Sequence, residues 1–440
     1  MHNPIVLTLA ALACMSCAQK KEPVTITVLN YLNLSDPNSA NQVASIWDEF
    51  EKQNPDIQLV REDAFNEDFH AKTASYLKNG TMPDVFTMWS GGRSAALHTA
   101  HTAKDLTPFL EKDNLLKEYT ETAIQPQYAG YLAELPDAIT YTSILYTSTK
   151  LLKENGLSVP SSYRDFKAMV PVLKEKHIQV ILMDNKDSWV MQSLLFSLVV
   201  GRYGGKDWFK NLETGKTTFT GKWFLKSLEI IDDMCRSGVI SQETLNYANG
   251  DSPAIFAAGK AAFFIGGDWK TATFQTDKAT GQGLLTKDAQ QNDFELLLMP
   301  EFPGEILHDS DSGTVGSGWA MNAAISAGSK KEEAAWKLIS YLESPYIQTY
   351  RLEIGTAFPT LKNLDIQKLA DTYGLEPFTV KRADFYKKYP VITPVIDSVL
   401  PSEVYTVINE ALHGIIKAQT SPEKAAADIQ NAWEVFSSRQ

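Results

Sequence analysis

The chain has few cysteines, no excess of basic residues and no long internal apolar run. Its 440 residues include 3 cysteines, and only Cys235 lies beyond the first 17 positions, so the body of the protein cannot hold a disulfide framework. The net charge of −12 at pH 7 argues against a nucleic-acid partner, which requires a basic surface. No internal run reaches the roughly 18 apolar residues of a membrane span. A disulfide-stapled scaffold, a nucleic-acid-binding protein and a multi-span membrane protein are thereby excluded.

The first residues are typical of an export signal. Residues 5–15 are mostly apolar and are followed by small residues and a cysteine, which is the order found in secretory leaders. We interpret 1–17 as a signal peptide with a lipobox, Cys17 as the lipidated residue and 18–23 as a tether. Cys14 is a competing site, and in a further alternative both cysteines are ordinary apolar residues of the leader. A lipidated Cys17 would anchor an extracytoplasmic protein, periplasmic or on the cell surface, to a membrane.

Length and hydrophobic pattern predict two α/β lobes. With 440 residues, 44% of them apolar, the chain is longer than a single core usually spans. Alternating apolar residues predict strands, and apolar residues at i, i+3, i+4 and i+7 predict helices. The first segments are a strand at 24–32, a helix ending at Asn54, a strand at 57–60, a helix at 68–77 and a strand at 84–88. This β-α-β-α-β order indicates a parallel sheet with helices on its faces.

The rest of the chain continues the alternation of helices and strands. The pattern predicts a helix from about Tyr163 to Lys176 and a strand at 178–183. A final helix is expected after Ser421, because a proline and an acidic residue follow this candidate N-cap. The stretch HDSDSG (308–313) is rich in serine and glycine, and we expect it to form a solvent-exposed loop.

Patterns that signal catalysis or metal binding are weak. His98 and His101 are three residues apart and can share a helix face, but no acidic or cysteine cluster nearby completes a tetrahedral metal site. Asp309 and Asp311 fall in the expected exposed loop, whereas hydrolysis of a sugar needs paired carboxylates in a cleft. The spacings of a nucleophile elbow, a phosphate loop and a His-based triad are missing. We therefore expect a binding protein without catalytic residues, metal or cofactor.

Five segments, in order along most of the chain, resemble the family 1 extracellular solute-binding proteins, the group that includes maltose-binding protein. They are NPDIQLV, PDVFTMWSGG, LPDAITYTSILYTSTKLLKENGL, FAAGKAAFFIGGDW and GSGWAMNAAISAGSKKEEAAWKLISYLESPYIQ. The third segment departs from the family's Tyr-Asn-Lys-Asp signature, because Thr147, Ser148 and Thr149 follow Tyr146. Those residues belong to the start of a helix, so the departure leaves the expected fold intact.

The resemblance implies the type II periplasmic-binding-protein fold, which has two lobes and a hinged cleft. Each lobe would be a mainly parallel sheet flanked by helices. Lobe 1 would comprise 24–137 plus 319–363, and lobe 2 would comprise 138–316 plus 364–440. The resemblance also implies the substrate-binding component of an ABC sugar importer, with a sugar as ligand and membrane permease subunits as partners. We expect a monomer that binds no nucleic acid.

The candidate ligand contacts suit a sugar. A sugar offers apolar C–H faces to aromatic rings and a rim of hydroxyls to carboxylates, amides and arginine. By the resemblance, or by position after a predicted strand or hinge, the candidates are Trp89, Ser90, Arg93, Trp269, Asp268, Trp189, Gln192, Trp319, Tyr405, Asn33, Asp36 and Tyr141. Gly91 and Gly92 are expected to let backbone N–H groups approach the sugar.

Some candidates have a structural alternative, and other functions stay open. Trp89 can instead cap its lobe, Asp268 can cap the next helix, and Trp319 can pack beneath the cleft. The same fold could bind a non-sugar solute such as a polyamine or a metal chelate, although polyamines would need several carboxylates. A surface carbohydrate-binding adhesin or enzyme is the other alternative.

Overall fold

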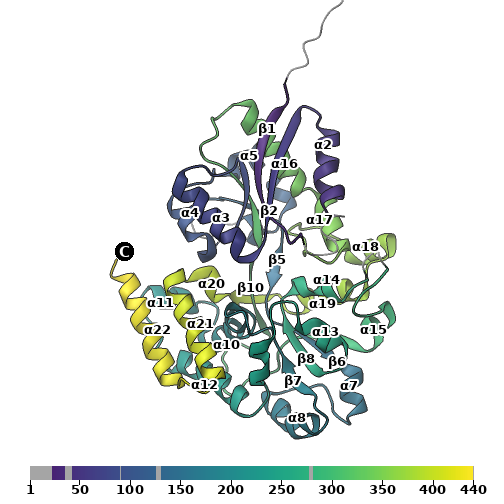
Figure 1. The fold of residues 1–440 in the computed structure, drawn as a ribbon, viewed down its shortest axis with the longest axis vertical. Coiled ribbons are helices and arrows are strands. Elements are labelled where there is room, and N and C mark those ends of the chain that lie inside the picture. Colours follow the sequence, from purple (N-terminus) through teal and green to yellow (C-terminus); the bar gives the residue numbers. More distant parts are fainter. Residues whose placement is uncertain (1–21, 35–41, 90, 125–129, 277–280, 440) are drawn as a thin grey trace, which may run out of the picture.

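The computed structural model describes residues 22–34, 42–89, 91–124, 130–276 and 281–439, and these form two lobes stacked along the long axis (Figure 1). The upper lobe in that view, lobe 1, surrounds a five-stranded sheet, and lobe 2 contains a four-stranded and a three-stranded sheet. Within the described ranges, no helix has both the length and the apolar character needed to cross a membrane.

Lobe 1 is the α/β layer that the N-terminal periodicity predicts. Its strand order is β2-β1-β3-β11-β4, with bounds β1 Val24–Tyr31, β2 Ile57–Ala64, β3 Val85–Trp89, β4 Leu135–Pro136 and β11 Ser317–Met321. Strands β1 and β2 pair in parallel from Val24↔Ile57 to Tyr31↔Ala64. The helices around the sheet include α2 (Glu49–Gln53), α3 (Asn66–Asn79), α4 (Ala95–Thr99), α5 (Thr107–Lys112), α16 (Lys330–Leu342) and α17 (Pro345–Glu353).

Lobe 2 is built from later parts of the chain. Its four-stranded sheet has the order β7-β8-β6-β9, and a three-stranded sheet has the order β12-β10-β5. The strand bounds are β5 Ile139–Tyr141, β6 Ile144–Ser148, β7 Gln179–Leu182, β8 Ala261–Gly266, β9 Phe294–Leu297, β10 Ser310–Val315 and β12 Val391–Pro394. The principal helices are α7 (Thr149–Glu154), α8 (Tyr163–Glu175), α10 (Ser197–Gly204), α11 (Trp208–Glu213), α12 (Lys222–Arg236), α13 (Ser252–Ala257), α14 (Thr271–Phe274), α15 (Lys287–Asn292), α18 (Ile366–Tyr373), α19 (Pro377–Lys388), α20 (Ile396–Val399), α21 (Ser402–Ile416) and α22 (Pro422–Ser437).

The two larger sheets are mixed, because each contains one strand that runs against its neighbours. In lobe 1, β11 pairs antiparallel with both β3 and β4. In lobe 2, β6 pairs antiparallel with both β8 and β9. Strand β11 is where the chain returns to lobe 1, since it follows β10 of lobe 2, and β6 follows β5, the first strand of lobe 2. The parallel pairing expected from the N-terminal segments is found for β1, β2 and β3.

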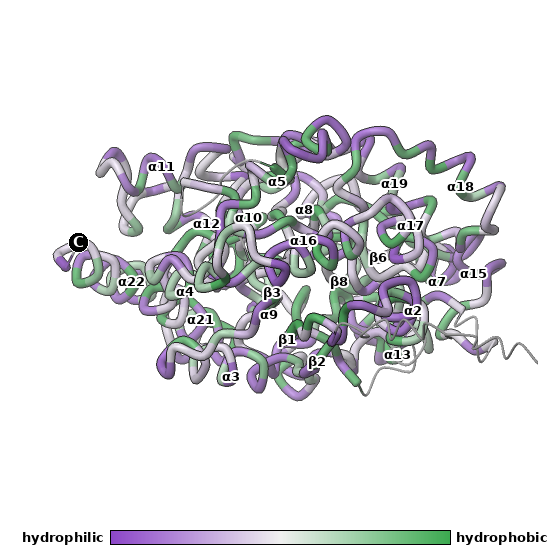
Figure 2. The backbone as a smooth tube through the Cα atoms, turned by 90° about the horizontal axis from the view of Figure 1, so that it is seen from above, coloured by the Kyte–Doolittle hydropathy of each residue, from purple (hydrophilic) through white to green (hydrophobic). Residues whose placement is uncertain are grey.

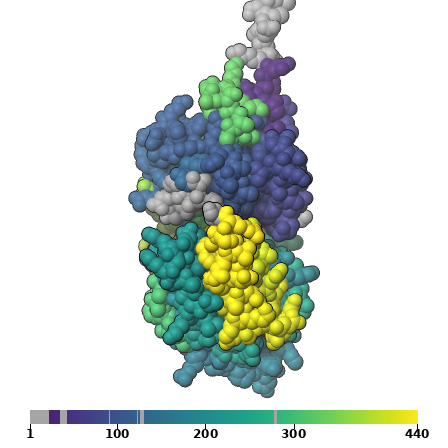
Figure 3. All heavy atoms as spheres, turned by 90° about the vertical axis from the view of Figure 1, so that its left-hand side faces the viewer, coloured from purple at the N-terminus to yellow at the C-terminus, as the bar shows by residue number. Residues whose placement is uncertain are grey.

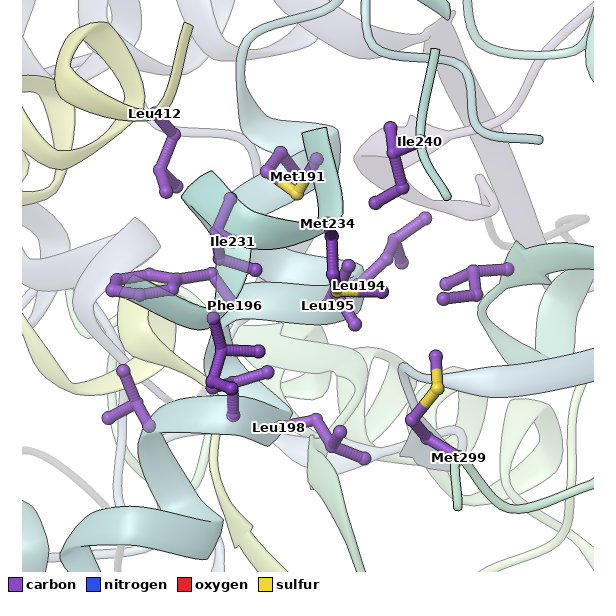
Figure 4. Close-up of a cluster of buried hydrophobic side chains, with 14 of the residues drawn as sticks. Met191, Leu194, Leu195, Phe196, Leu198, Ile231, Met234, Ile240, Met299 and Leu412 are labelled. Carbon is purple, nitrogen blue, oxygen red and sulfur yellow. The ribbon is translucent and has the colours of Figure 1, made fainter. Parts of the chain in front are cut away.

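The largest hydrophobic cluster lies in lobe 2. Its middle is an apolar helical run, formed by α9 (Trp189–Met191), the π-helical turn η4 (Gln192–Phe196) and α10, which is buried between α12, α21 and the strands. Figure 4 shows side chains of this cluster, including Met191, Leu194, Leu195, Phe196, Leu198, Ile231, Met234, Ile240, Met299 and Leu412. Hydrophobic stretches concentrate in interior strands such as β1 and β8, with hydrophilic stretches toward the periphery (Figure 2).

The C-terminal helices cover one side of lobe 2. Helix α22 begins after Ser421, whose hydroxyl accepts a hydrogen bond from the Lys424 backbone N–H at 3.3 Å, as the sequence predicts. Ile429 of this helix is fully buried against the largest cluster, and Trp433 and Phe436 pack on its edge. Figure 3 shows these helices forming the surface of lobe 2 up to its boundary with lobe 1.

The expected exposed loop at 308–313 is wrong in its second half. Residues Ser310–Val315 form the central strand β10, parallel to β12 and antiparallel to β5, and Asp311 has no exposed surface. Small polar residues have low strand propensity, but cross-strand pairing on both sides overrides it. The change places a carboxylate in the protein interior where the sequence had predicted one in solvent.

Candidate functional site

Aromatic side chains gather where β1 and β3 of lobe 1 end. Tyr31 is the last residue of β1 and Trp89 the last of β3, and the carboxyl ends of parallel strands are where ligands bind in open α/β sheets. The two rings meet edge to face, with centroids 5.1 Å apart and an interplanar angle of 84°. Phe69 and His70 of α3 lie against Trp89 at centroid distances of 5.7 and 5.4 Å. Trp89 is therefore held in a fixed orientation while part of its ring stays exposed.

A cavity of about 260 Å³ adjoins Trp89 in lobe 1. It lies between α3 on one side and Arg93, Ser94 and α4 on the other. Its lining residues are Phe69, His70, Thr73, Ala74, Leu77, Lys78, Thr87, Trp89, Arg93, Ser94, Ala96 and Leu97. Its lining is mostly apolar with a few polar groups, as in small-molecule sites, but its volume is smaller than the roughly 300–1,000 Å³ of such sites.

Lobe 2 contributes a second pair of tryptophans. Trp189 begins α9 and Trp269 lies in the short 3-10 turn η6 (Asp268–Lys270), directly after β8. Their ring centroids are 6.5 Å apart with an interplanar angle of 41°, and both residues are partly exposed. The Trp269 ring lies over Gly267, where a β-carbon would collide with it. Glycine at this position is therefore needed to place the ring.

Arg93 connects the two lobes. Its Nη2 and Nε groups donate to Oδ2 of Asp397 at 2.7 and 3.1 Å, and Asp397 belongs to α20 of lobe 2. The Arg93 guanidinium carbon also lies 5.7 Å from the centroid of the Trp189 ring, within reach of a cation–π interaction. Burial disfavours the charge of Arg93, but Asp397 outweighs this effect and raises the pKa of Arg93. The residue is in contact with Trp89's cavity on one side and with Trp189 on the other.

Two further polar side chains, His70 and Tyr405, lie near Arg93 and Asp397. Burial, and then the charge of Arg93, lowers the pKa of His70, so its imidazole is neutral at pH 7 and offers one donor and one acceptor. Burial, and then the charge of Asp397, raises the pKa of Tyr405 on α21, so its hydroxyl stays protonated. Tyr31, His70, Trp89, Arg93, Trp189 and Asp397 thus form one group of contacting residues that spans both lobes, which we call the interlobe cluster; Tyr405 lies near enough for the charges of Asp397 and Arg93 to act on its hydroxyl.

Four of the expected contacts are buried elsewhere. Gln192 has no exposed surface and donates to Ser197 at 3.3 Å inside the lobe 2 core. Trp319 is 4% exposed and packs edge to face on Trp47, with centroids 5.5 Å apart; this is the alternative of a ring beneath the cleft. Tyr141 donates to the Tyr389 carbonyl at 3.0 Å.

Asp268 is also buried. Its carboxylate accepts a hydrogen bond from the Tyr386 hydroxyl, and Tyr141 stacks on the Tyr386 ring at 4.0 Å. Burial raises the pKa of Asp268 to about 6, although Arg382 opposes this shift. Because its carboxylate is buried and already hydrogen-bonded to Tyr386, we do not include Asp268 among the residues proposed to contact a ligand.

Of the remaining expected residues, the structure describes only Asn33. Asn33 follows β1 and is partly exposed. Ser90, Asp36 and Cys17 lie outside the described residues. Within the described ranges, no group of three or more His, Cys, Asp or Glu residues is arranged to hold a metal ion.

Sequence reasoning missed Tyr31, His70 and Asp397. Tyr31 could have been found by the rule that selected Trp89, since both end a parallel strand of the same sheet. Asp397 gave no local signal, because it meets Arg93 across 304 residues of chain. The glycines have a second use that the sequence did not indicate: β-carbons on Gly91 and Gly92 would collide with the carbonyls of Ser398 and Leu400, so these glycines allow the segment at α20 to come close.

Comparison with known proteins agrees with this architecture. The chitin oligosaccharide binding protein superposes with a TM-score of 0.79 at 18% identity, over 94% of this chain and 98% of that chain. A protein from a study of xylan utilization by Caldanaerobius polysaccharolyticus gives 0.80 at 20% identity, covering 93% and 99%. The maltose/maltodextrin-binding domain from Bdellovibrio bacteriovorus, bound to maltotriose, gives 0.70 at 18% identity, covering 95% and 100%.

These superpositions show that the two-lobed fold is shared, and at 18–20% identity the likeness is one of fold alone. The sequence profile of the bacterial extracellular solute-binding proteins matches residues 36–349 of this chain, which is most of its length and includes Trp89, Trp189 and Trp269. The chain belongs to the family of bacterial extracellular solute-binding proteins.

Proposed function

We propose that the protein binds an extracytoplasmic carbohydrate, a mono- or oligosaccharide, between its lobes and delivers it to the permease of an ABC importer. The observation that carries the proposal is the set of partly exposed tryptophans on both lobes, Trp89 from lobe 1 and Trp189 and Trp269 from lobe 2. Indole rings stack on the C–H faces of sugars, and rings on both lobes would let one ligand favour the closed form.

Polar groups beside these rings support the same ligand class. Arg93 uses one N–H of Nε and one of Nη2 for Asp397, and a guanidinium has five N–H groups, so others remain for hydroxyls. The neutral His70 and the Tyr405 hydroxyl can each donate and accept. Asn33, and with it Ser90 and Asp36 of the undescribed segments, stay in the proposed contact set.

A sugar fits the cluster better than a cationic solute. The Asp397 carboxylate is already paired with Arg93, and the Asp268 carboxylate with Tyr386, whereas a polyamine would need free carboxylates. The chitin oligosaccharide binding protein and the maltotriose complex carry carbohydrate in their names. These likenesses of fold support the carbohydrate class.

We also propose how the whole chain is divided into lobes and how it is attached to a membrane. We retain lobe 1 as 24–137 plus 319–363 and lobe 2 as 138–316 plus 364–440, with the hinge at the crossings between them. We further propose a monomer whose signal peptide with lipobox (1–17) is cut immediately before Cys17, so that Cys17 stays on the mature chain and carries the lipid that anchors it to a membrane. Mass spectrometry of the N-terminal peptide of protein extracted from membranes tests this anchor, and an unmodified Cys17 there would contradict it.

Tryptophan fluorescence titration with chito-, xylo- and malto-oligosaccharides tests the ligand class. We expect saturation with one series, and a loss of roughly tenfold or more in affinity for Trp89→Ala and Trp269→Ala, because a stacked aromatic is worth about 1 kcal/mol beyond its buried area and about 1.4 kcal/mol is tenfold. Trp433→Ala is the matched control, since Trp433 is a partly buried tryptophan on the edge of the lobe 2 core.

Two results would contradict the proposal. If no sugar binds the folded protein while a polyamine or metal chelate does, the ligand class is wrong. If an oligosaccharide is cleaved on incubation, as judged by chromatography, the protein is an enzyme and not a transport receptor. Equal affinity losses in Trp89→Ala and Trp433→Ala would remove Trp89 from the site.

A further inference from the structure

The Arg93–Asp397 ion pair joins residues of different lobes. Arg93 lies in the turn η2 (Gly92–Ser94) that follows β3, and Asp397 lies in α20. In Figure 1, α20 lies on the face of lobe 2 that is turned toward α3 and α4 of lobe 1. Both hydrogen bonds end on Oδ2 of Asp397. The pair therefore spans the boundary between the lobes.

The ion pair is shielded from solvent. The side chain of Asp397 is 7% exposed and that of Arg93 is 28% exposed. Solvent-exposed ion pairs contribute little to stability, but pairs with charge-assisted hydrogen bonds that are partly buried are stronger and less screened by salt. If the lobes separated, both charges would lose this partner and return to water.

Beside the ion pair, the backbone of the loop after β3 packs closely against the segment at α20. Gly91 and Gly92 are both buried, and β-carbons on them would collide with the main-chain carbonyls of Ser398 and Leu400. A loop with larger residues could not come this close to α20. Glycine is thus required by the lobe contact itself, independently of any ligand.

The contact also assembles the proposed ligand site. Arg93, held by Asp397, places its guanidinium over the Trp189 ring of lobe 2 while lining the cavity beside Trp89 of lobe 1. Arg93 thus lies between the cavity beside Trp89 and the Trp189 ring of the other lobe.

We propose that Arg93, Asp397 and the two glycines form a latch that holds the lobes closed before a solute binds. The lobes of such a protein then spend part of their time closed in the absence of solute, and the solute binds a cleft that is already partly assembled. Because apparent affinity falls with the fraction of protein in the competent state, a weaker latch lowers affinity for every solute alike. The inference does not depend on the class of solute.

Small-angle X-ray scattering of the purified full chain without added sugar tests the latch. We expect Arg93→Gln and Asp397→Asn to increase the radius of gyration, because the closed form loses its ion pair. The charge-exchanged double variant, Arg93→Asp with Asp397→Arg, should return it toward the wild-type value. Gly91→Val should open the protein with both charges intact.

The control breaks an ion pair inside lobe 1. Lys104 and Glu332 are 2.5 Å apart and similarly shielded, so Glu332→Gln should leave the radius of gyration unchanged. Thermal unfolding followed by circular dichroism confirms that each variant is folded. Wild-type radii in both single variants would overturn the latch, as would a double variant that stays as open as the single ones.

Discussion

Replacing Asp311 by asparagine should make the stability difference from the wild type depend on pH. Asp311 has no exposed surface; its Oδ1 accepts from the Ser312 N–H at 2.7 Å, and its Oδ2 has no hydrogen-bond partner among the described residues. Burial raises its pKa from 3.8 to about 7, opposed by Arg202 and Ser143 and assisted by Asp268. The folded protein therefore holds a proton that the unfolded chain has released between these two pH values.

The size of the effect follows from linkage. A pKa raised from 3.8 to about 7 corresponds to at most about 4 kcal/mol. For a group whose folded pKa is raised, this stability is fully present below pH 3.8 and is lost as the pH rises to about 7. The amide that replaces this carboxyl cannot ionise, so Asp311→Asn should gain on the wild type by up to that amount between about pH 4 and 7.5.

Urea unfolding at several pH values across this range measures the difference. Any fixed cost of packing an amide cancels, because only the change of the difference with pH is used. Buried carboxyls that are distant from Asp311 titrate alike in both proteins and cancel as well, whereas Asp268, whose charge acts on Asp311, contributes to the measured change. Gln291→Ala, at an exposed residue that carries no titratable group, should give a difference that is constant with pH. A constant difference for Asp311→Asn, or one that grows as the pH falls, would refute the reasoning.

Three other predictions concern the core, a helix cap and the free thiol. Phe196→Ala should lower the free energy of unfolding by about 3–5 kcal/mol, because Phe196 is fully buried in the largest cluster, and a urea midpoint within error of wild type would contradict this. Ser421→Ala should cost about 1 kcal/mol through its lost bond to the Lys424 N–H, whereas Ser421→Asp should restore most of it in the same assay. Burial raises the pKa of the Cys235 thiol to about 12, so a disulfide reagent at about pH 8 should react with it many times faster in urea than in buffer; equal rates would show an exposed thiol.

Elements with a clear hydrophobic period could be predicted from the sequence. The strand at β3 and the helices α8 and α22 lie within a few residues of their predicted bounds, because one buried face fixes the spacing of apolar residues. The strand β10 could not be found this way. Its serines and glycine are buried in a strand whose two edges pair with β12 and β5, and such non-local pairing leaves no periodic trace.

The candidate site shows the same division. Trp89 and Trp269 could be selected because a bulky ring directly after a buried strand has no role in an ordinary turn. Gln192 is buried in the lobe 2 core, and a polar residue at the start of an apolar helix cannot be told by pattern from one that faces a cleft. Asp397 was beyond reach, because its partner is fixed only when the lobes meet.

The loop after β3 serves both lobes at once, and this limits how mutations can be interpreted. Trp89 presents a ring to the proposed cleft, while Gly91 and Arg93 meet α20. Substitution of Arg93 alters the polar rim and the latch together, so a lower affinity in that variant would not say which was lost. Trp269, on the other lobe, changes only the ring wall, and Gly91 changes only the lobe contact. Comparing sugar affinity in Trp269→Ala and Gly91→Val therefore separates the contribution of stacking from that of closure.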